Sequence, residues 1–272
     1  MKYRPIQAPL LLRRLALCIE VYGVRGAIRD TYQRLSRSLR NRGFRGTFKR
    51  IVGITPKSPV EPVPLQTNTF DLIHGTDTGG FIYGQSLSTL HGTAYLGSSP
   101  SSLTPALSEL PLRHEDFTFI DLGCGKGRAL LVAAQFPFRH LFGVESAGEL
   151  CDIARANAAI YSNWAARISI VNQHAKNFTY PDGPLLLYLY NPFFAPVLRR
   201  VLNNLERQLR HAPRPAFILY ADNPRFTQVI DSFPFLRELS EMQYPLSSED
   251  AALNPFNRTE EWYTLYFADF TL

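Results

Sequence analysis

The stretch FIDLGCGKGR, Phe119 to Arg128, decides the fold of this chain. An apolar run ending in Asp121 enters a turn with alternating glycines, Gly123, Gly125 and Gly127, and the helix-like segment ALLVAAQF follows at once. Such a unit presents a nucleotide-like ligand in α/β sheets, because the glycines allow close backbone approach and the helix N-terminus faces the ligand. The spacing D-x-G-x-G-x-G differs from the dinucleotide fingerprint G-x-G-x-x-G, and the preceding acid favours a cationic ligand over a pyrophosphate.

Strand-like and helix-like segments alternate from Asp116 onward. Strands are expected at FTFIDL, HLFGVE, ISIVNQH, LLLYLYN and AFILYAD, and helices at RALLVAAQF, GELCDIARANAAIYSN and APVLRRVLNNLERQLR. Two further segments, FLRELSEMQYPL and EWYTLYFADF, are expected to form a terminal antiparallel pair. The pattern predicts an α/β fold with a doubly wound, mostly parallel, seven-stranded Rossmann-like sheet, a C-terminal antiparallel β pair and an N-terminal helical arm.

The glycine turn resembles motif I of the class I S-adenosylmethionine-dependent methyltransferases, and GVESAGELCDIARAN is similar to the corresponding stretch of that class. Glu145 ends a strand 20 residues after Gly125, where an acid can accept both ribose hydroxyls. Cys124 is expected to fill space, since no histidine lies nearby in the sequence to activate it as a nucleophile. The resemblance implies the cofactor S-adenosyl-L-methionine, held by Asp121, Gly123, Cys124, Gly125, Gly127 and Glu145.

Two further elements depart from the pattern of that class. His174 stands where an aspartate usually closes the adenine pocket, and a neutral imidazole accepts a hydrogen bond less strongly than a carboxylate. The segment YNPFF resembles the (Asn/Asp)-Pro-Pro-(Tyr/Phe) loop of amino-group methyltransferases, with Phe193 in place of the second proline. This likeness implies catalytic roles for Asn191, Pro192 and Phe193, in which amide oxygens orient the amine lone pair and an aromatic ring stacks on the substrate. The alternatives are a plain loop histidine and a strand-ending turn whose phenylalanines belong to the core.

Upstream of motif I, YLGSSPSSL is similar to a Tyr-x-Pro-(Thr/Ser) segment of non-SET protein-lysine methyltransferases, with Gly97 in place of the proline. The likeness implies that Tyr95 and Ser98 cover the cofactor, and that Asp77 or Thr78 helps form a lid. The segments 70–82 and 91–103 are rich in Gly, Ser and Thr and are expected to be loops outside the core. Residues 70–272 as a whole resemble a poorly characterised group of bacterial class I methyltransferases with GxDTxG, FxDxGxGKGR and YNPF segments.

Charge and proline content divide the chain. The first 50 residues contain 13 of the 29 lysines and arginines but only Glu20 and Asp30 of the 23 acids, a net charge of +11 that leaves −5 for the remainder. The predicted organisation is a basic amphipathic helical arm (1–52), a Pro-rich linker (53–69), cofactor lid loops with a helix (70–110) and the methyltransferase core (111–272). The arm is expected to be a solvated face packed on the domain, a contact for an anionic membrane surface or nucleic acid, or a mitochondrial presequence.

Composition excludes several other classes. The most apolar stretch near the start, APLLLRRLALCIEVYGV, is interrupted by Arg13, Arg14 and Glu20, so neither a transmembrane segment nor a cleavable signal is expected. Three cysteines without metal spacing fit a reducing, cytoplasmic location, peripheral to a membrane if the arm binds one. The sequence therefore predicts methyl transfer to an amine nitrogen, a protein lysine first, with nucleic-acid bases and small molecules left open. The rivals are a catalytically silent S-adenosylmethionine-binding scaffold and an NAD-dependent oxidoreductase, the latter disfavoured by the glycine spacing and by Asp121.

Overall fold

The structure is a computed structural model that describes residues 68–82, 95–161, 167–221 and 229–269. All of them belong to one compact unit, Val63–Leu272. The predicted arm (1–52) and nearly all of the predicted linker (53–69) lie outside the described residues, so those two predictions and the boundary between them stay predictions.

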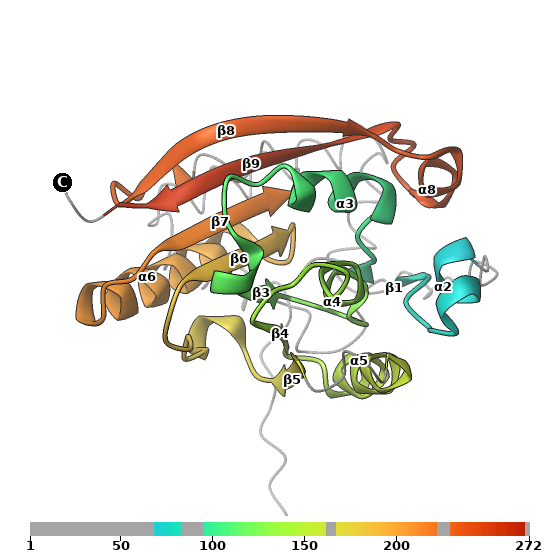
Figure 1. The fold of residues 1–272 in the computed structure, drawn as a ribbon, viewed down its shortest axis with the longest axis horizontal. Coiled ribbons are helices and arrows are strands. Elements are labelled where there is room, and N and C mark those ends of the chain that lie inside the picture. Colours follow the sequence, from blue (N-terminus) through green and yellow to red (C-terminus); the bar gives the residue numbers. More distant parts are fainter. Residues whose placement is uncertain (1–67, 83–94, 162–166, 222–228, 270–272) are drawn as a thin grey trace, which may run out of the picture. The chain divides into compact units, whose positions relative to one another are not determined.

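A seven-stranded sheet forms the centre of this unit (Figure 1). Five strands run parallel, and β9 pairs antiparallel with β7 on one side and with β8 on the other. In spatial order the strands are β5 (Ile168–Asn172), β4 (His140–Glu145), β3 (Thr118–Leu122), β6 (Leu185–Tyr190), β7 (Ala216–Ala221), β9 (Glu260–Ala268) and β8 (Leu236–Pro245). This arrangement confirms the predicted Rossmann-like fold with its C-terminal antiparallel pair.

The strand order brings the loops that follow the parallel strands to one edge of the sheet. Parallel strands end at the same edge, so the residues that follow β3, β4, β5 and β6 gather there. Chain progression reverses between β3 and its neighbour β6, because β4 and β5 extend the sheet in one direction while β6 and β7 extend it in the other. Such a topological switch point is where open α/β sheets bind their ligands.

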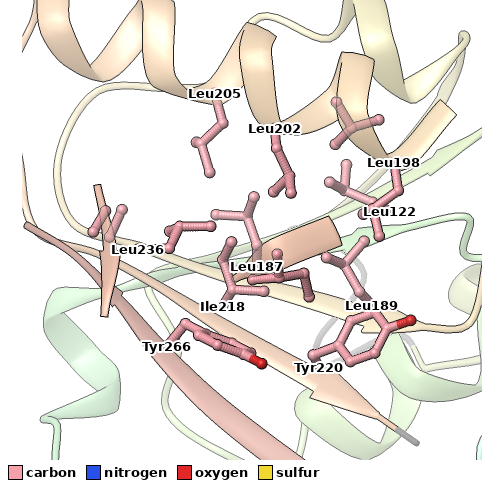
Figure 2. Packing of buried hydrophobic residues seen from close by; sticks show 14 of the residues in the cluster. Leu122, Leu187, Leu189, Leu198, Leu202, Leu205, Ile218, Tyr220, Leu236 and Tyr266 are labelled. Carbon is pink, nitrogen blue, oxygen red and sulfur yellow. The ribbon is translucent and has the colours of Figure 1, made fainter. Parts of the chain in front are cut away.

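Strand β6 shows why both faces of the sheet are covered. Its sequence LLLYLY is apolar at nearly every position, and alternate side chains enter two separate buried clusters. Leu187 and Leu189 contribute to the cluster under α6 (Ala195–His211), whose Leu198, Leu202 and Leu205 point at the sheet in Figure 2. Each such leucine contributes about 1.5–3 kcal/mol by its burial.

The opposite cluster takes Leu186 and Tyr188 of β6 together with side chains of α3 (Pro100–Ser108) and α4 (Arg128–Ala133). Helix α5 (Gly148–Ile160) follows β4, and α8 (Ser248–Leu253) connects β8 to β9. Two 3-10 helices, His114–Asp116 and Ala175–Asn177, precede β3 and follow β5. No helix among the described residues is both long enough and apolar enough to cross a membrane.

The segment 70–82 differs from the expectation of loops outside the core. Helix α2 (Thr69–His74) begins here, where Asn68 accepts a hydrogen bond from Asp71 N at 2.7 Å. Strand β1 (Phe81–Ile82) pairs antiparallel with β2 (Tyr95–Leu96), and Thr78, between α2 and β1, is fully buried. The expectation was wrong because polar residues of this segment are buried against charged partners further along the chain, which local composition does not reveal.

Candidate cofactor and acceptor site

The glycine turn after β3 has a backbone that only glycine adopts readily. Gly123, Gly125 and Gly127 have φ values of 90°, 53° and 87°, in the left-handed region. The amides of Gly123 and Cys124 both donate to Val144 O, at 2.8 and 3.2 Å, which ties the turn to β4. The glycines therefore let the chain leave β3 and begin α4 within a few residues of the switch point.

Two side chains press on this turn so closely that a methyl group would not fit. A Cβ on Gly123 would lie 2.4 Å from Cβ of Pro192, and one on Gly125 would lie 2.3 Å from the ring of Tyr95. Tyr95 comes from β2 and Pro192 follows β6, so the turn brings together elements far apart in the sequence. Of the residues predicted for the site, Gly123 is in direct contact with Pro192, and Gly125 is in direct contact with Tyr95.

Two carboxyl groups lie at the ends of the neighbouring strands β3 and β4. Asp121 is buried, and its pKa is raised to about 8, mainly by burial and further by the charge of Glu145. Glu145 binds backbone amides: Oε1 accepts from Ser146 N at 2.7 Å and Ala147 N at 2.8 Å, and Oε2 accepts from Gly125 N at 3.1 Å. A ligand carrying positive charge near Asp121 would favour its ionised form.

Cys124 fills the space beneath the turn. It is 4% exposed, and burial raises the pKa of its thiol well above the ordinary value, which keeps it protonated. A Cβ on Gly143 of β4 would lie only 2.8 Å from its Sγ, so the thiol packs directly on the neighbouring strand. The environment is unsuited to a nucleophile.

Tyr95 and Ser98, predicted to cover the cofactor, are both engaged with protein atoms. The Tyr95 hydroxyl donates to Thr78 O at 2.6 Å, and burial raises its pKa. Ser98 is buried and accepts a hydrogen bond from the hydroxyl of Tyr188 at 3.0 Å. Tyr95 thus presents its ring to the glycine turn, while Ser98 fixes the start of α3 on β6.

The segment around Asp77 and Thr78, predicted to form a lid, is held by two buried cations of the motif itself. Lys126 Nζ donates to Asp77 Oδ1 at 2.6 Å and to Gly79 O at 2.9 Å. Arg128 Nε donates to Thr78 Oγ1 at 2.7 Å. The Lys126 and Arg128 side chains are only 6% and 8% exposed, so these contacts replace their hydration.

Asn157 of α5 completes the attachment. Its Oδ1 accepts from Asp77 N at 2.8 Å, and its Nδ2 donates to Asp77 O at 2.8 Å and to Lys126 O at 2.9 Å. One buried amide therefore joins the upstream segment, the glycine turn and the helix after β4. The sequence reasoning missed Lys126, Arg128 and Asn157, although two basic residues inside a ligand-binding turn, with acids upstream, were a signal for such a contact.

Asp71 organises the same segment from within. Its carboxylate accepts hydrogen bonds from Asn68 Nδ2 at 2.6 Å, from Thr76 Oγ1 at 2.7 Å, and from Thr78 N and Oγ1 at 2.9 and 2.6 Å. Burial alone would raise the pKa of Asp71, but these hydrogen bonds outweigh it and lower the pKa below the ordinary value. Arg128 adds a more distant contact, 3.7 Å from Asp71 Oδ2.

The acceptor loop predicted at YNPFF begins directly after β6. Asn191 has a positive φ of 48°, which asparagine tolerates better than most residues, and its Oδ1 accepts a hydrogen bond from the Tyr220 hydroxyl at 3.3 Å. Phe193 is partly buried and packs against the cluster under α6, whereas Phe194 is 44% exposed. Within this loop the exposed phenylalanine is therefore Phe194, next to Phe193, for which a catalytic role was predicted from the sequence.

His174, predicted for the adenine pocket, is exposed and follows β5 at the same edge as the two acids. Its position after the third parallel strand agrees with the location expected from the sequence, since β5 neighbours β4 and Glu145 ends β4. Among the described residues, no group of three histidines, cysteines or acids could hold a metal ion.

A buried carboxylate behind the acceptor loop was not predicted. Glu261 of β9 is fully buried and accepts hydrogen bonds from four hydroxyls. Its Oε1 accepts from Tyr190 at 2.6 Å and Ser99 at 3.0 Å, and its Oε2 accepts from Tyr263 at 3.1 Å and Ser102 at 2.5 Å. Tyr190 is the residue before Asn191, so this cluster connects the acceptor loop to α3 and β9.

One family model matches part of this chain. Residues 90–181 match the family "Histone methylation protein DOT1", a stretch that contains the glycine turn, Glu145 and His174. No curated protein matches the chain.

Similar solved structures include the O-MT of StiE, residues 961–1257 (16% identity, 62% of this chain and 74% of that chain, TM-score 0.45). Others are a SAM-dependent methyltransferase from Leishmania major (11% identity, 60% and 69%, TM-score 0.45) and precorrin-6y C5,15-methyltransferase from Geobacter metallireducens (14% identity, 61% and 86%, TM-score 0.43).

The seven-stranded fold, the glycine turn between two acids at the switch point and the family match identify a class I S-adenosylmethionine-dependent methyltransferase. This class uses S-adenosylmethionine as its methyl donor.

Proposed function

We propose that this chain transfers a methyl group from S-adenosylmethionine to an amine nitrogen, with a protein lysine as the preferred acceptor. The family matched by residues 90–181 is described as a histone methylation protein, which supports a protein acceptor. The observation that carries the proposal is the contact of Gly123 with Pro192, because it places the acceptor loop against the cofactor turn at the switch point of the sheet.

The residues of the turn fit the cofactor. The crowded glycines leave backbone rather than side chains at the surface of the turn, and the buried carboxyl of Asp121 gains its missing charge partner from a cationic ligand. We assign Asp121, Gly123, Cys124, Gly125, Gly127 and Glu145 to cofactor binding, with Tyr95 and Ser98 covering it, His174 at the adenine and Asn191 at the reacting end. When bound, S-adenosylmethionine supplies an electrophilic methyl group on a sulfonium.

The acceptor loop would position the nucleophile. The Tyr220 hydroxyl donates to Asn191 Oδ1, and this hydrogen bond would fix which end of the carboxamide faces the substrate. The loop would hold the neutral amine nitrogen towards the methyl group that bound S-adenosylmethionine would supply, and the methylated ammonium would release its proton to solvent. Such a displacement depends on positioning more than on acid–base groups.

Calorimetry tests the assignment of the cofactor-binding residues, and a methyl-transfer assay tests the assignment of the acceptor loop. Asp121→Ala and Glu145→Ala should weaken S-adenosylmethionine binding, whereas Asp152→Ala, which removes an exposed acid paired with Arg155 on α5, should not. Asn191→Ala should keep cofactor affinity and abolish transfer of labelled methyl groups to proteins of a cell lysate. Unchanged affinity in both acid variants would refute the cofactor assignment, and equal loss of binding and transfer in Asn191→Ala would give the loop a purely architectural role.

A silent cofactor-binding scaffold is the second candidate. The observation that favours it is the exposed His174, which lacks the carboxylate usual at this place. A protein that binds S-adenosylhomocysteine but labels nothing in any lysate would support this reading. Stabilisation by NAD, and none by S-adenosylhomocysteine, would instead support the oxidoreductase rival.

We further propose that the basic arm, 1–52, binds anionic surfaces and does not assist catalysis. Its net positive charge predicts co-sedimentation with anionic liposomes or duplex DNA that falls steeply as salt rises. Deleting the arm should leave S-adenosylhomocysteine affinity intact. Unfolding on deletion, or absence of binding to either surface, would show that the arginines form the solvated face of a packed segment.

A further inference from the structure

Two segments that press on the glycine turn are joined to each other by buried hydrogen bonds. Tyr95 of β2 lies against Gly125, and Pro192 after β6 lies against Gly123. The first segment continues from Tyr95 to Ser99, the N-cap of α3, and the second begins directly after the last residue of β6. The spacing of the two segments therefore depends on what connects Ser99 with the end of β6.

Glu261 of β9 supplies this connection through one of its two carboxylate oxygens. Its Oε1 accepts from Ser99 Oγ at 3.0 Å and from the Tyr190 hydroxyl at 2.6 Å. Tyr190 immediately precedes Asn191, the residue proposed to orient the acceptor nitrogen. Ser99 lies four residues after Tyr95, whose ring contacts the glycine turn. One oxygen atom therefore links the segment proposed to cover the cofactor with the loop proposed to hold the acceptor.

A second hydrogen bond joins the same two parts of the chain. The hydroxyl of Tyr188 donates to Ser98 Oγ at 3.0 Å, and both residues are buried. Because alternate residues of a strand face the same side of a sheet, Tyr188 and Tyr190 extend from β6 in the same direction. The two tyrosines thus hold the residues before α3 along the end of β6, and the bond of Tyr190 to Glu261 is the one nearest the acceptor loop.

The Ser99 hydroxyl does not take the role that its position favours. A serine at the N-cap of a helix ordinarily accepts a hydrogen bond from a backbone amide of the first turn. The Ser99 side chain makes no such bond in α3 and donates to Glu261 instead. Asp250 of α8 accepts from Ser101 N at 3.0 Å, so a first-turn amide of α3 is satisfied from another element. The hydroxyl of Ser99 is committed to the link with β9.

Stability alone does not account for a carboxylate at this position. Glu261 is fully buried, and its four partners are neutral hydroxyls. Removing a carboxylate from water is costly, and well-packed apolar residues often stabilise a protein as well as a buried charge does, whereas fixing a register is the best-attested use of such groups. Its Oε2 accepts from Ser102 of α3 and Tyr263 of β9, while Oε1 serves the two segments that flank the glycine turn.

We propose that Glu261 is a positioning residue for methyl transfer, whose Oε1 fixes the distance between the segment Tyr95–Ser99 and the acceptor loop. The inference rests on the proposed function, because this distance matters for the reaction only if methyl donor and acceptor meet between the two segments. Since Glu261 is fully buried, it acts through Ser99 and Tyr190. Methyl displacement depends steeply on the alignment of the reacting atoms, and a misplacement of about 1 Å costs up to about 10²-fold in rate.

Transfer rates at saturating S-adenosylmethionine separate the roles of the two oxygens. Ser99→Ala and Tyr190→Phe each remove one bond to Oε1 and should each lower the rate of labelled methyl transfer to lysate proteins about tenfold. The KM for S-adenosylmethionine and the affinity for S-adenosylhomocysteine should stay unchanged. The matched controls, Ser102→Ala and Tyr263→Phe, remove bonds to Oε2 and should lower the free energy of unfolding by a similar amount while keeping the transfer rate. Equal rate losses in controls and test variants would overturn the proposal.

A double-mutant cycle tests whether the two hydroxyls act through one link. Because Ser99 and Tyr190 meet at the same oxygen, loss of either interrupts the connection. The double variant Ser99→Ala/Tyr190→Phe should therefore be about as slow as either single variant, and not about a hundredfold slower than the unaltered protein. Losses that multiply would show two independent hydroxyls and would contradict a bridging carboxylate.

Glu261→Gln is the direct variant, but its amide nitrogen cannot accept hydrogen bonds, so hydroxyls on that side lose their acceptor and the fold itself is at risk. The four hydroxyl variants, each of which removes a single bond, therefore carry the test.

Failure of the proposed function gives a different result. An unaltered protein that binds S-adenosylhomocysteine but transfers no methyl group would refute the proposed function, and the positioning role with it. An unaltered protein that transfers methyl groups, with Ser99→Ala and Tyr190→Phe equally fast, would overturn the positioning role alone.

Discussion

Pro192 packs on Gly123 so closely that a Cβ on the glycine would lie 2.4 Å from Cβ of the proline. The two residues follow β3 and β6, the adjacent strands at which chain progression reverses. Their contact is therefore a property of the switch point, and it makes the position of the acceptor loop depend on the glycine turn.

Gly123→Ala should push the acceptor loop away from the glycine turn. The variant should lose about 1–3 kcal/mol of unfolding free energy from backbone strain, with a further loss from the collision with Pro192, and S-adenosylhomocysteine affinity should fall. Gly80→Ala is the control, because Gly80 has nearly the same φ, 91° against 90°, but nothing lies within 4 Å of its Cβ position. Urea denaturation and calorimetry compare the two, and equal effects would mean that strain alone, not the contact, matters.

Asp121 should make the stability of the ligand-free protein depend on pH. Its folded-state pKa, about 8, lies above the ordinary value of 3.8, so the folded state holds a proton that the unfolded chain releases. The unfolding free energy should therefore fall as pH rises from 4 to 8, by up to about 1.4 kcal/mol per pH unit from this group. Asp121→Asn should lack this component. Urea denaturation at several pH values measures it, and parallel curves for the two proteins would contradict the assignment.

Tyr190→Phe should loosen the acceptor loop. The variant removes the hydrogen bond to Glu261 Oε1, at a cost of about 1.5–3 kcal/mol for a bond to a charged group. Tyr263→Phe removes a comparable bond to the same carboxylate at a residue outside the loop. Amide hydrogen exchange at residues 191–194 should accelerate only in Tyr190→Phe, and methyl transfer should fall there with cofactor affinity unchanged. Equal exchange in both variants would limit Glu261 to a general structural role.

The unfolding free energy should fall by different amounts when Lys126 or Asp77 loses its partner. The Lys126 side chain is 6% exposed and that of Asp77 is 57% exposed. Asp77→Ala leaves a buried ammonium without its carboxylate, at a cost of roughly 2–4 kcal/mol, whereas Lys126→Met leaves a solvated carboxylate and keeps most of the packing. Urea denaturation should therefore show the larger loss for Asp77→Ala, and the opposite order would contradict this account of the buried pair.

His174→Asp should strengthen cofactor binding. A carboxylate accepts a hydrogen bond more strongly than a neutral imidazole, by about 1 kcal/mol or roughly fivefold in affinity. Calorimetry with S-adenosylhomocysteine measures the effect. His211→Asp, at the exposed last residue of α6 near the opposite edge of the sheet, is the control because it changes the net charge by the same amount. Unchanged affinity in His174→Asp would remove His174 from the adenine pocket.

The sheet could be predicted from the sequence because its strands are buried and bounded by clear signals. HLFGVE coincides with β4, and LLLYLY with β6, since apolar runs of this length between turns form buried strands in an alternating chain. Helix α2 escaped prediction because it has six residues, none of them buried, and so no apolar periodicity. The sequence signals for this helix were Asn68, which caps its first turn, and Gly75, which follows its last residue.

The site was predictable to the extent that its residues follow strand ends. Asp121, Glu145, His174 and Asn191 lie at one edge because the parallel topology requires it. Glu261 was missed because a Glu-Glu pair at the start of a strand suggests a solvated surface. Its spacing of two and four residues from the buried Tyr263 and Leu265 was the signal that places it on the core face.

The four hydrogen bonds that Asp71 receives have a consequence for the cost of ligand binding. They order the segment from Asn68 to Thr78 in the ligand-free protein, and Lys126, Arg128 and Asn157 attach it to the glycine turn. The conformational entropy of this segment is therefore lost when the chain folds and not when a ligand arrives. Ligand affinity at the turn should therefore not be reduced by the ordering of residues 68–78, and association should not wait for this segment to close.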